Sequence, residues 1–184
     1  MMDQFLEQVA SKRNSGIQSL SIAFAWAVMV ITGLYGLLLF TQITYAFSES
    51  VTAGIVQIVA TLIFIGAAVL IFLFKDRLRT EYEYTFTNGT LDFAAVYNNV
   101  KRKALGTMNL KNIKACGKVA SGSFNRYINL PGLKRSNWFA NREADLFYIY
   151  FEKENMKRII IMEPNEEMER LIRGAVPQGA YQVN

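Results

Sequence analysis

Residues 51–74 read VTAGIVQIVATLIFIGAAVLIFLF, a run that contains no Lys, Arg, Asp or Glu. As an α-helix this run rises roughly 36 Å, which is enough to cross the hydrocarbon core of a bilayer with some tilt. A second run, Leu20–Phe40, is equally free of charge and rises roughly 31 Å. Each central Val, Ile, Leu or Phe favours insertion by roughly 0.3 to 0.6 kcal/mol, and no charge opposes it. The two runs predict a transmembrane helical hairpin over residues 17–78.

Two other interpretations fit these runs less well. Lys12 and Arg13 resemble the basic start of a signal peptide, but the apolar run that follows is longer than the roughly 7–15 residues of such signals. Buried helices of a soluble protein carry a polar stripe, and neither run has one. We therefore expect two membrane spans, at about residues 20–40 and 51–74.

The charges that flank the spans predict their orientation. Two bases precede the first span and three follow the second, whereas the connection, residues 41–50, carries only Glu49. Lys and Arg are enriched in the cytoplasmic segments of membrane proteins. We therefore expect a multi-pass protein of the cell membrane with both the N- and the C-terminus in the cytoplasm. The flanking bases are Lys12, Arg13, Lys75, Arg77 and Arg79.

The N-terminal segment, residues 1–16, is predicted to be a cytoplasmic amphipathic element. Phe5, Leu6 and Val9 fall on one face of a helix, with charged residues elsewhere. Two interpretations stay open, namely a short helix lying in the membrane interface and a frayed turn that leads into the first span.

Residues 79–176 carry the signals of a β domain. Glu81–Thr87 alternates polar and aromatic residues, Asn88-Gly89 is a strong hairpin-turn signal, and Thr90–Phe93 resumes the alternation. A second hairpin is predicted over residues 146–162, with its turn at Lys153-Glu154-Asn155.

Weaker signals fill the rest of this domain. Further strands are expected over residues 100–107, 113–119 and 123–130, and a loop over Leu130–Phe139. Pro164 and the acids after it open an amphipathic helix that ends near Gly174. Residues 177–184 are expected to form a tail.

Strands in succession followed by one helix resemble the bacterial pleckstrin-homology-like (PH-like) domains, which commonly follow one or two transmembrane helices. The whole chain resembles a family of uncharacterised two-span bacterial proteins through its stretches Met2–Gln8, Glu81–Asp92 and Asn98–Lys103. The resemblance implies a membrane α-helical hairpin plus an α+β soluble domain. That domain would be an antiparallel β barrel or sandwich of about six or seven strands with a C-terminal capping helix.

Composition argues against catalysis. The chain has no His, which removes the commonest general base and metal ligand, and Cys116 is its only cysteine. Gly117 and Gly122 fit neither a Walker nor a dinucleotide motif. We expect no enzyme, no catalytic residue, no cofactor and no metal, and an inert buried thiol at Cys116.

Charge is the feature of the soluble part that suggests binding. Ten bases and no acid occur from Lys101 to Arg142, whereas residues 143–184 hold eight acids and five bases. Near a bilayer such bases contact anionic headgroups; the alternative is an ordinary solvated surface. The aromatic residues among them lack a nucleic-acid signature. The candidate lipid or partner patch consists of Lys101, Arg102, Lys103, Lys111, Lys114, Lys118, Lys134, Arg135, Trp138 and Phe139.

Trp138-Phe139 suits either insertion at the lipid interface or coverage of the core. The function we expect is a membrane-anchored interaction module that binds a protein or anionic lipid at the cytoplasmic face of a bacterial membrane. The alternative is an accessory or regulatory subunit of a transport or envelope complex, with partner contacts made by the hairpin. The expected partners are membrane lipids, a membrane or cytoplasmic protein and a second copy of the chain, and not nucleic acid.

Overall fold

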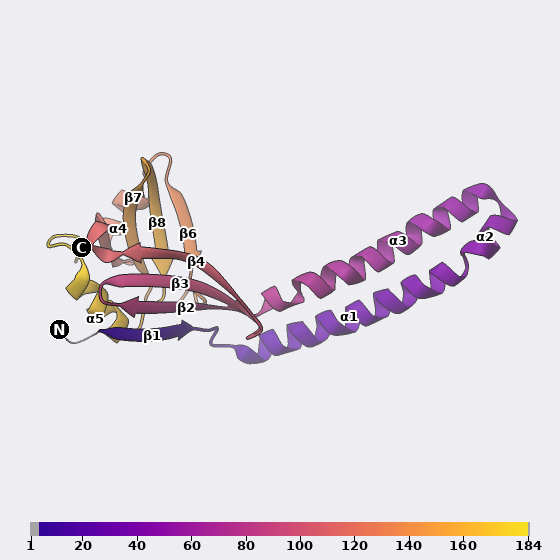
Figure 1. The fold of residues 1–184 in the computed structure, drawn as a ribbon, viewed down its shortest axis with the longest axis horizontal. Helices are drawn as coiled ribbons and strands as arrows, with labels where there is room; N and C mark the ends of the chain where they lie inside the picture. The colour runs from indigo at the N-terminus through magenta and orange to yellow at the C-terminus, as the bar shows by residue number, and fades with distance from the viewer. Residues whose placement is uncertain (1–3, 184) are drawn as a thin grey trace. The chain divides into compact units, whose positions relative to one another are not determined.

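The fold is shown in Figure 1 as a computed structural model that describes residues 4–183. It contains two compact units, which we describe separately. Residues 4–13 and 80–183 form the β unit, and residues 14–79 form the hairpin unit. The predicted terminal segments 1–16 and 177–184 include positions 1–3 and 184, which lie outside the described residues.

The hairpin unit is almost entirely helical. The connection over residues 41–50 lies where it was expected, but it is largely helical and not a loop, because helix resumes after Gln42 in a stretch without Gly or Pro. The chain turns at Ser50, whose backbone is extended and whose hydroxyl accepts a hydrogen bond from Ala53 N at 3.1 Å, capping the next helix. The elements are α1 Ser15–Thr41, α2 Ile43–Glu49, α3 Val51–Phe74 and the 3₁₀ helix η1 Lys75–Leu78.

Helices α1 and α3 approach closely at Gly36 and also contact through the Tyr35 and Phe64 rings, while many of their large apolar residues face outward. A Cβ atom added at Gly36 would lie 2.8 Å from Ile65 Cγ1, and Thr61 is buried. Phe24 is 70% exposed and Leu62 is 65% exposed. Small residues at the interface and large apolar residues outside are typical of membrane helices. Two helices, Gly16–Thr41 and Val51–Leu78, are long and apolar enough to cross a membrane.

The β unit contains two sheets in its described residues. The four-stranded sheet has the order β1-β2-β3-β4 and is antiparallel throughout; we call it sheet A. The five-stranded sheet, sheet B, has the order β6-β8-β7-β5-β9. The strands are β1 Phe5–Ala10, β2 Thr80–Thr87, β3 Thr90–Tyr97, β4 Lys101–Asn109, β5 Ala115–Lys118, β6 Lys134–Trp138, β7 Phe147–Lys153, β8 Met156–Met162 and β9 Tyr181–Gln182; the helices are η2 Leu110–Asn112, α4 Gly122–Ile128 and α5 Glu166–Ala175.

Both predicted hairpins are confirmed. Strands β2 and β3 pair across Asn88 and Gly89, whose φ angles of 47° and 86° are those that a type I′ turn requires. Strands β7 and β8 pair across Glu154 and Asn155, which also have positive φ.

Both interpretations of the N-terminal segment, an interface helix and a frayed turn, are wrong, because Phe5–Ala10 forms strand β1 and pairs antiparallel with β2. Its burial alternates as a strand does: Leu6 packs against the core and Ala10 is buried, while Phe5 and Val9 are exposed. The short segment fits both periodicities, and only the partner strand, some 70 residues later, decides between them. The β unit therefore begins before the hairpin unit and resumes after it.

Three further expectations are corrected. The strand over residues 123–130 is wrong: Phe124, Tyr127 and Ile128 have helical spacing in α4 and pack on Tyr148 and Tyr150 of sheet B.

The loop over residues 130–139 and the C-terminal tail each contain a strand. Lys134–Trp138 is β6, which runs parallel to β8 at the edge of sheet B. Tyr181–Gln182 is β9, which runs parallel to β5. Neither strand has a hairpin partner next to it in sequence, so no local turn signal announces it.

The core lies between the two sheets. Tyr84 and Phe86 of β2 meet Phe147 and Ile149 of β7, and all four are fully buried. Helix α5 adds Met168 and Ile172 to the same cluster; its N-cap is Asn165, whose side chain accepts from Met168 N at 2.8 Å.

Candidate functional site

The basic tract Lys101–Lys103 lies at one end of β4, an edge strand of sheet A. Lys101 is opposite Tyr97, which in turn is opposite Thr80, where the chain enters β2 from residue 79. Lys101 and Lys103 project to one side and Arg102 to the other, where its Nε lies 2.6 Å from Glu83 Oε2. All three are exposed, and in the described chain no acid pairs with Lys101 or Lys103. The tract therefore carries positive charge to the end of the sheet that adjoins the hairpin in sequence.

The structure does not bring the other predicted patch residues to this end. Lys111 follows the far end of β4, about 26 Å along the strand from Lys101. Lys118 Nζ lies 2.6 Å from Glu169 Oε2, so its charge is paired within the β unit. The remaining bases of the predicted patch are Lys114, before β5, and Lys134 and Arg135, at the start of β6.

Trp138 covers the core, which is one of the two roles expected for it. Its ring lies 4.8 Å from that of Phe93, and its carbonyl oxygen accepts a hydrogen bond from the Tyr84 hydroxyl. Phe139 is half-buried. The pair is therefore part of the β unit's packing.

A polar cluster that the sequence did not reveal fastens β1 to the rest of the β unit. Gln8 Nε2 donates to Glu163 O, and Asn165 N donates to Gln8 Oε1, both at 2.8 Å. The Glu163 carboxylate accepts from Ala140 N and from both nitrogens of Asn141, at 2.8 to 3.1 Å.

Asn141 completes this cluster on the other side. Its Nδ2 donates to Ser11 O at 2.9 Å, and its Oδ1 accepts from Arg13 N at 3.1 Å. Every contact of the cluster joins segments more than 20 residues apart, so no local motif marks it. It holds residues 4–13 in place and offers no free acid–base pair, because the Glu163 carboxylate already accepts three hydrogen bonds.

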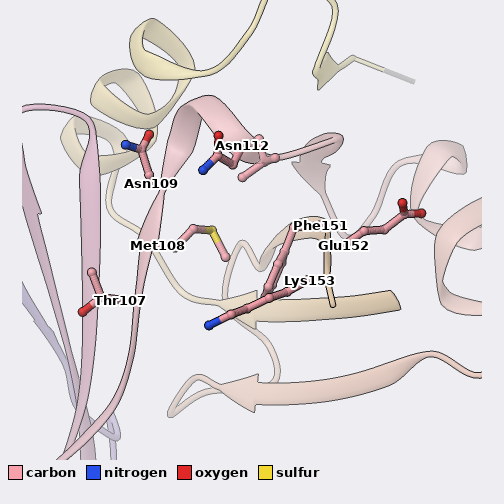
Figure 2. A pocket seen from close by; sticks show the side chains of 8 residues that line it. Thr107, Met108, Asn109, Asn112, Phe151, Glu152 and Lys153 are labelled. Atoms are coloured by element: carbon pink, nitrogen blue, oxygen red, sulfur yellow. The ribbon is translucent and has the colours of Figure 1, made fainter. Parts of the chain in front are cut away.

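A cavity of about 260 Å³ opens between the end of β4 and the end of β7. Met108 and Phe151 form its apolar part, and Asn109 and Asn112 add polar groups, whereas the Thr107 side chain points away and donates a hydrogen bond to Asp92 (Figure 2). Lys153 extends toward β4, whereas Glu152 extends to the opposite side of β7 and accepts a hydrogen bond from the Tyr150 hydroxyl at 2.7 Å.

Cys116 is fully buried, as expected from the sequence. Burial, followed by the nearby charge of Glu169, raises the pKa of its thiol to about 12, so the nucleophilic thiolate is scarce at neutral pH. Among residues 4–183 no group of three His, Cys, Asp or Glu side chains is arranged to hold a metal ion.

Two apolar helices and a sheet-rich domain that begins before them and resumes after them define the class of protein, a PH-like domain joined to a helical hairpin. The model of the bacterial PH-like domain family (DUF6106) matches residues 2–182. The chain belongs to this family, and the match covers strand β1, the hairpin and the rest of the β unit. No curated protein and no solved structure matched the chain.

Proposed function

We propose that the protein is a non-enzymatic interaction module, anchored by its hairpin at the cytoplasmic face of a bacterial membrane, whose PH-like domain binds anionic lipid through the tract Lys101–Lys103. The pairing of β1 with β2 is the observation that carries the anchoring by two spans, and the exposed bases at the end of β4 support the lipid contact. Because both strands belong to one sheet, the chain must leave and re-enter on the same side of the membrane. Two spans meet this requirement, and the exterior of the hairpin is apolar enough to face lipid.

The positive charges support the cytoplasmic orientation. The tract lies at the end of sheet A where the chain joins the hairpin, and Lys75, Arg77 and Arg79 follow α3 directly. Each Lys or Arg near an anionic leaflet contributes about 1 kcal/mol to its attraction.

The orientation can be tested by cysteine labelling. In intact cells we expect a membrane-impermeant maleimide to label Glu49→Cys and to leave Val100→Cys unlabelled until the cells are opened. Val100 is 78% exposed, so a Cys there is accessible to the reagent on its own side of the membrane. The wild-type chain is the negative control, because its native Cys116 is buried and should not react with the reagent. Labelling of Val100→Cys in intact cells would overturn the topology.

The lipid contact must be separated from a second role of the same charges. Lys and Arg on an edge strand also prevent other strands from adding to the sheet. Reversal of Lys101, Arg102 and Lys103 to Glu keeps the edge charged but repels anionic headgroups, so it isolates the lipid contact.

For the wild-type chain, purified in mild detergent, we expect mass spectrometry to show preferential retention of phosphatidylglycerol from an equal mixture with phosphatidylcholine. The triple Glu variant should lose most of this preference, while Lys111→Glu with Lys114→Glu, at the far end of β4, should keep it. Between about 0.01 and 0.15 M salt the preference should weaken, since the Debye length falls from about 30 to 8 Å. If all three proteins retained phosphatidylglycerol with the same preference, the tract would not bind lipid. The domain would then have a protein as its partner.

One observation favours the second function, an accessory subunit of a transport or envelope complex that binds its partner through the hairpin. An apolar groove of about 820 Å³ runs along α1, lined by Ile17, Leu20, Phe24 and small residues between them, with Ile71 and Leu78. Replacement of the hairpin by an unrelated two-span hairpin should preserve function if the hairpin is only an anchor and abolish it if the groove binds a partner.

A further inference from the structure

We propose that the cavity between β4 and β7, together with Lys134 and Arg158 beside it, binds a small ligand that carries an oxyanion, a phosphate or carboxylate group, on a short apolar portion. This site lies apart from the tract Lys101–Lys103 and does not depend on the lipid contact proposed there.

Strand register places two bases side by side on the inner face of sheet B. Arg158 precedes Ile160 by two residues, so it projects to the same face as that core residue. Lys134 of β6 is directly opposite Arg158, and Phe151 of β7 is opposite it on the other side. Adjacent strands are about 5 Å apart, so the two cationic side chains start from neighbouring positions.

This arrangement is unfavourable without an anion. Arg158 Nε is buried and has no hydrogen-bond partner in the described part of the chain. Like charges directly opposite each other destabilise a sheet, and a buried donor without a partner keeps its full desolvation cost. The inner-face positions of β6, β7 and β8 include no Asp or Glu. A bound oxyanion would supply the charge and the acceptors that these strands lack.

Phe151 links the cavity to this pair of bases, although neither base lines the cavity itself. Phe151 is both the register partner of Arg158 and a wall of the cavity. Met108, Ile113 and Phe151 give an apolar surface, while Lys153 and the amides of Asn109 and Asn112 give polar contacts (Figure 2). Ligand pockets commonly combine an apolar lining with a few polar groups in volumes of about 300–1,000 Å³. A volume of about 260 Å³ therefore indicates a small ligand.

The test uses the full chain in neutral detergent, with inorganic phosphate as the probe and chloride at equal ionic strength as the reference. We expect phosphate to raise the unfolding temperature, because a ligand that binds only the folded state stabilises it. Lys134→Gln should weaken the apparent phosphate affinity about tenfold, the effect of losing one charge-assisted hydrogen bond, and Arg158→Gln at least as much. Lys134 is exposed on an edge strand, so its variant should fold even if Arg158→Gln does not.

Arg126→Gln is the matched control, because it removes one exposed base from α4, which packs on the opposite face of sheet B, and it should leave phosphate binding unchanged. The same proteins in nanodiscs identify the source of the oxyanion. Stabilisation by anionic over neutral nanodiscs that Lys134→Gln removes would assign the site to a lipid headgroup, and stabilisation by free phosphate alone would assign it to a soluble ligand. No stabilisation beyond chloride in either medium, or equal stabilisation of all variants, would overturn the proposal.

Discussion

A protein in which residues 4–13 are joined directly to residues 80–183 by a short Gly-Ser linker is expected to be soluble and to unfold in one cooperative step. The join is short, because Ala10 of β1 is already opposite Tyr82 of β2. By contrast, residues 79–176, the domain that the sequence alone delimits, should not fold stably. That piece lacks β1 and β9, so it exposes one edge of β2 and removes Leu6, Ala10 and Ala180 from the core.

The joined protein should have a much larger free energy of unfolding than the piece 79–176. The contacts that this piece loses contribute an amount comparable with the whole stability of a domain, about 5–15 kcal/mol. Circular dichroism and urea unfolding measure it. The joined protein with Leu6→Asp is the control for the packing of β1. Its free energy of unfolding should be close to that of the piece 79–176. If the short piece were as stable as the joined protein, β1 would not belong to the β unit.

Tyr84→Phe is expected to lower the free energy of unfolding by about 1–3 kcal/mol, although it removes a single oxygen atom. The fully buried Tyr84 hydroxyl donates to Trp138 O and accepts from Glu163 N at 3.2 Å. The hydroxyl therefore ties the ends of β6 and β8 to sheet A, and its loss leaves a backbone N–H and a carbonyl without this partner. Tyr82→Phe, at a half-buried position of the same strand, should change stability by less than about 0.5 kcal/mol.

The pH dependence gives a second readout for Tyr84. Burial is the main cause that raises its pKa above 10.0, so the unfolded state loses this proton first as the pH rises. The stability that depends on the protonated hydroxyl is complete below about pH 10 and declines above it. Tyr84→Phe should show a smaller decline than the wild type in urea unfolding followed from pH 9 to 11. An identical decline in both proteins would show that other groups control it.

The parts of the fold that follow from local pattern were predictable, and the parts fixed by distant partners were not. The turn at Asn88-Gly89 and the run of strand formers in β7 carry their own signals, so both hairpins were found. Strand β1 has no neighbour in sequence to pair with, and its six residues suit a helix as well as a strand. For α4, the spacing of Phe124, Tyr127 and Ile128 was available in the sequence but was outweighed by their preference for strands.

The candidate sites divide in the same way. The density of bases from Lys101 to Arg142 was visible in the sequence, but their distribution over both ends of β4 and over β6 depends on strand register. Lys134 and Arg158 are separated by 24 positions, with strand β7 between them in sequence, so only the parallel pairing of β6 with β8 brings them together.

The order in which the chain is made gives the pairing of β1 with β2 one further meaning. Strand β1 leaves the ribosome first, and its partner follows only after the whole apolar hairpin has been synthesised. On the proposed topology, insertion of both spans places β2 on the same side of the membrane as β1. Insertion of one span alone separates the two strands by the bilayer. A chain inserted wrongly would thus keep an unpaired strand edge and an open core, which are features that mark a protein for degradation. Completion of sheet A would then act as a test of correct membrane insertion.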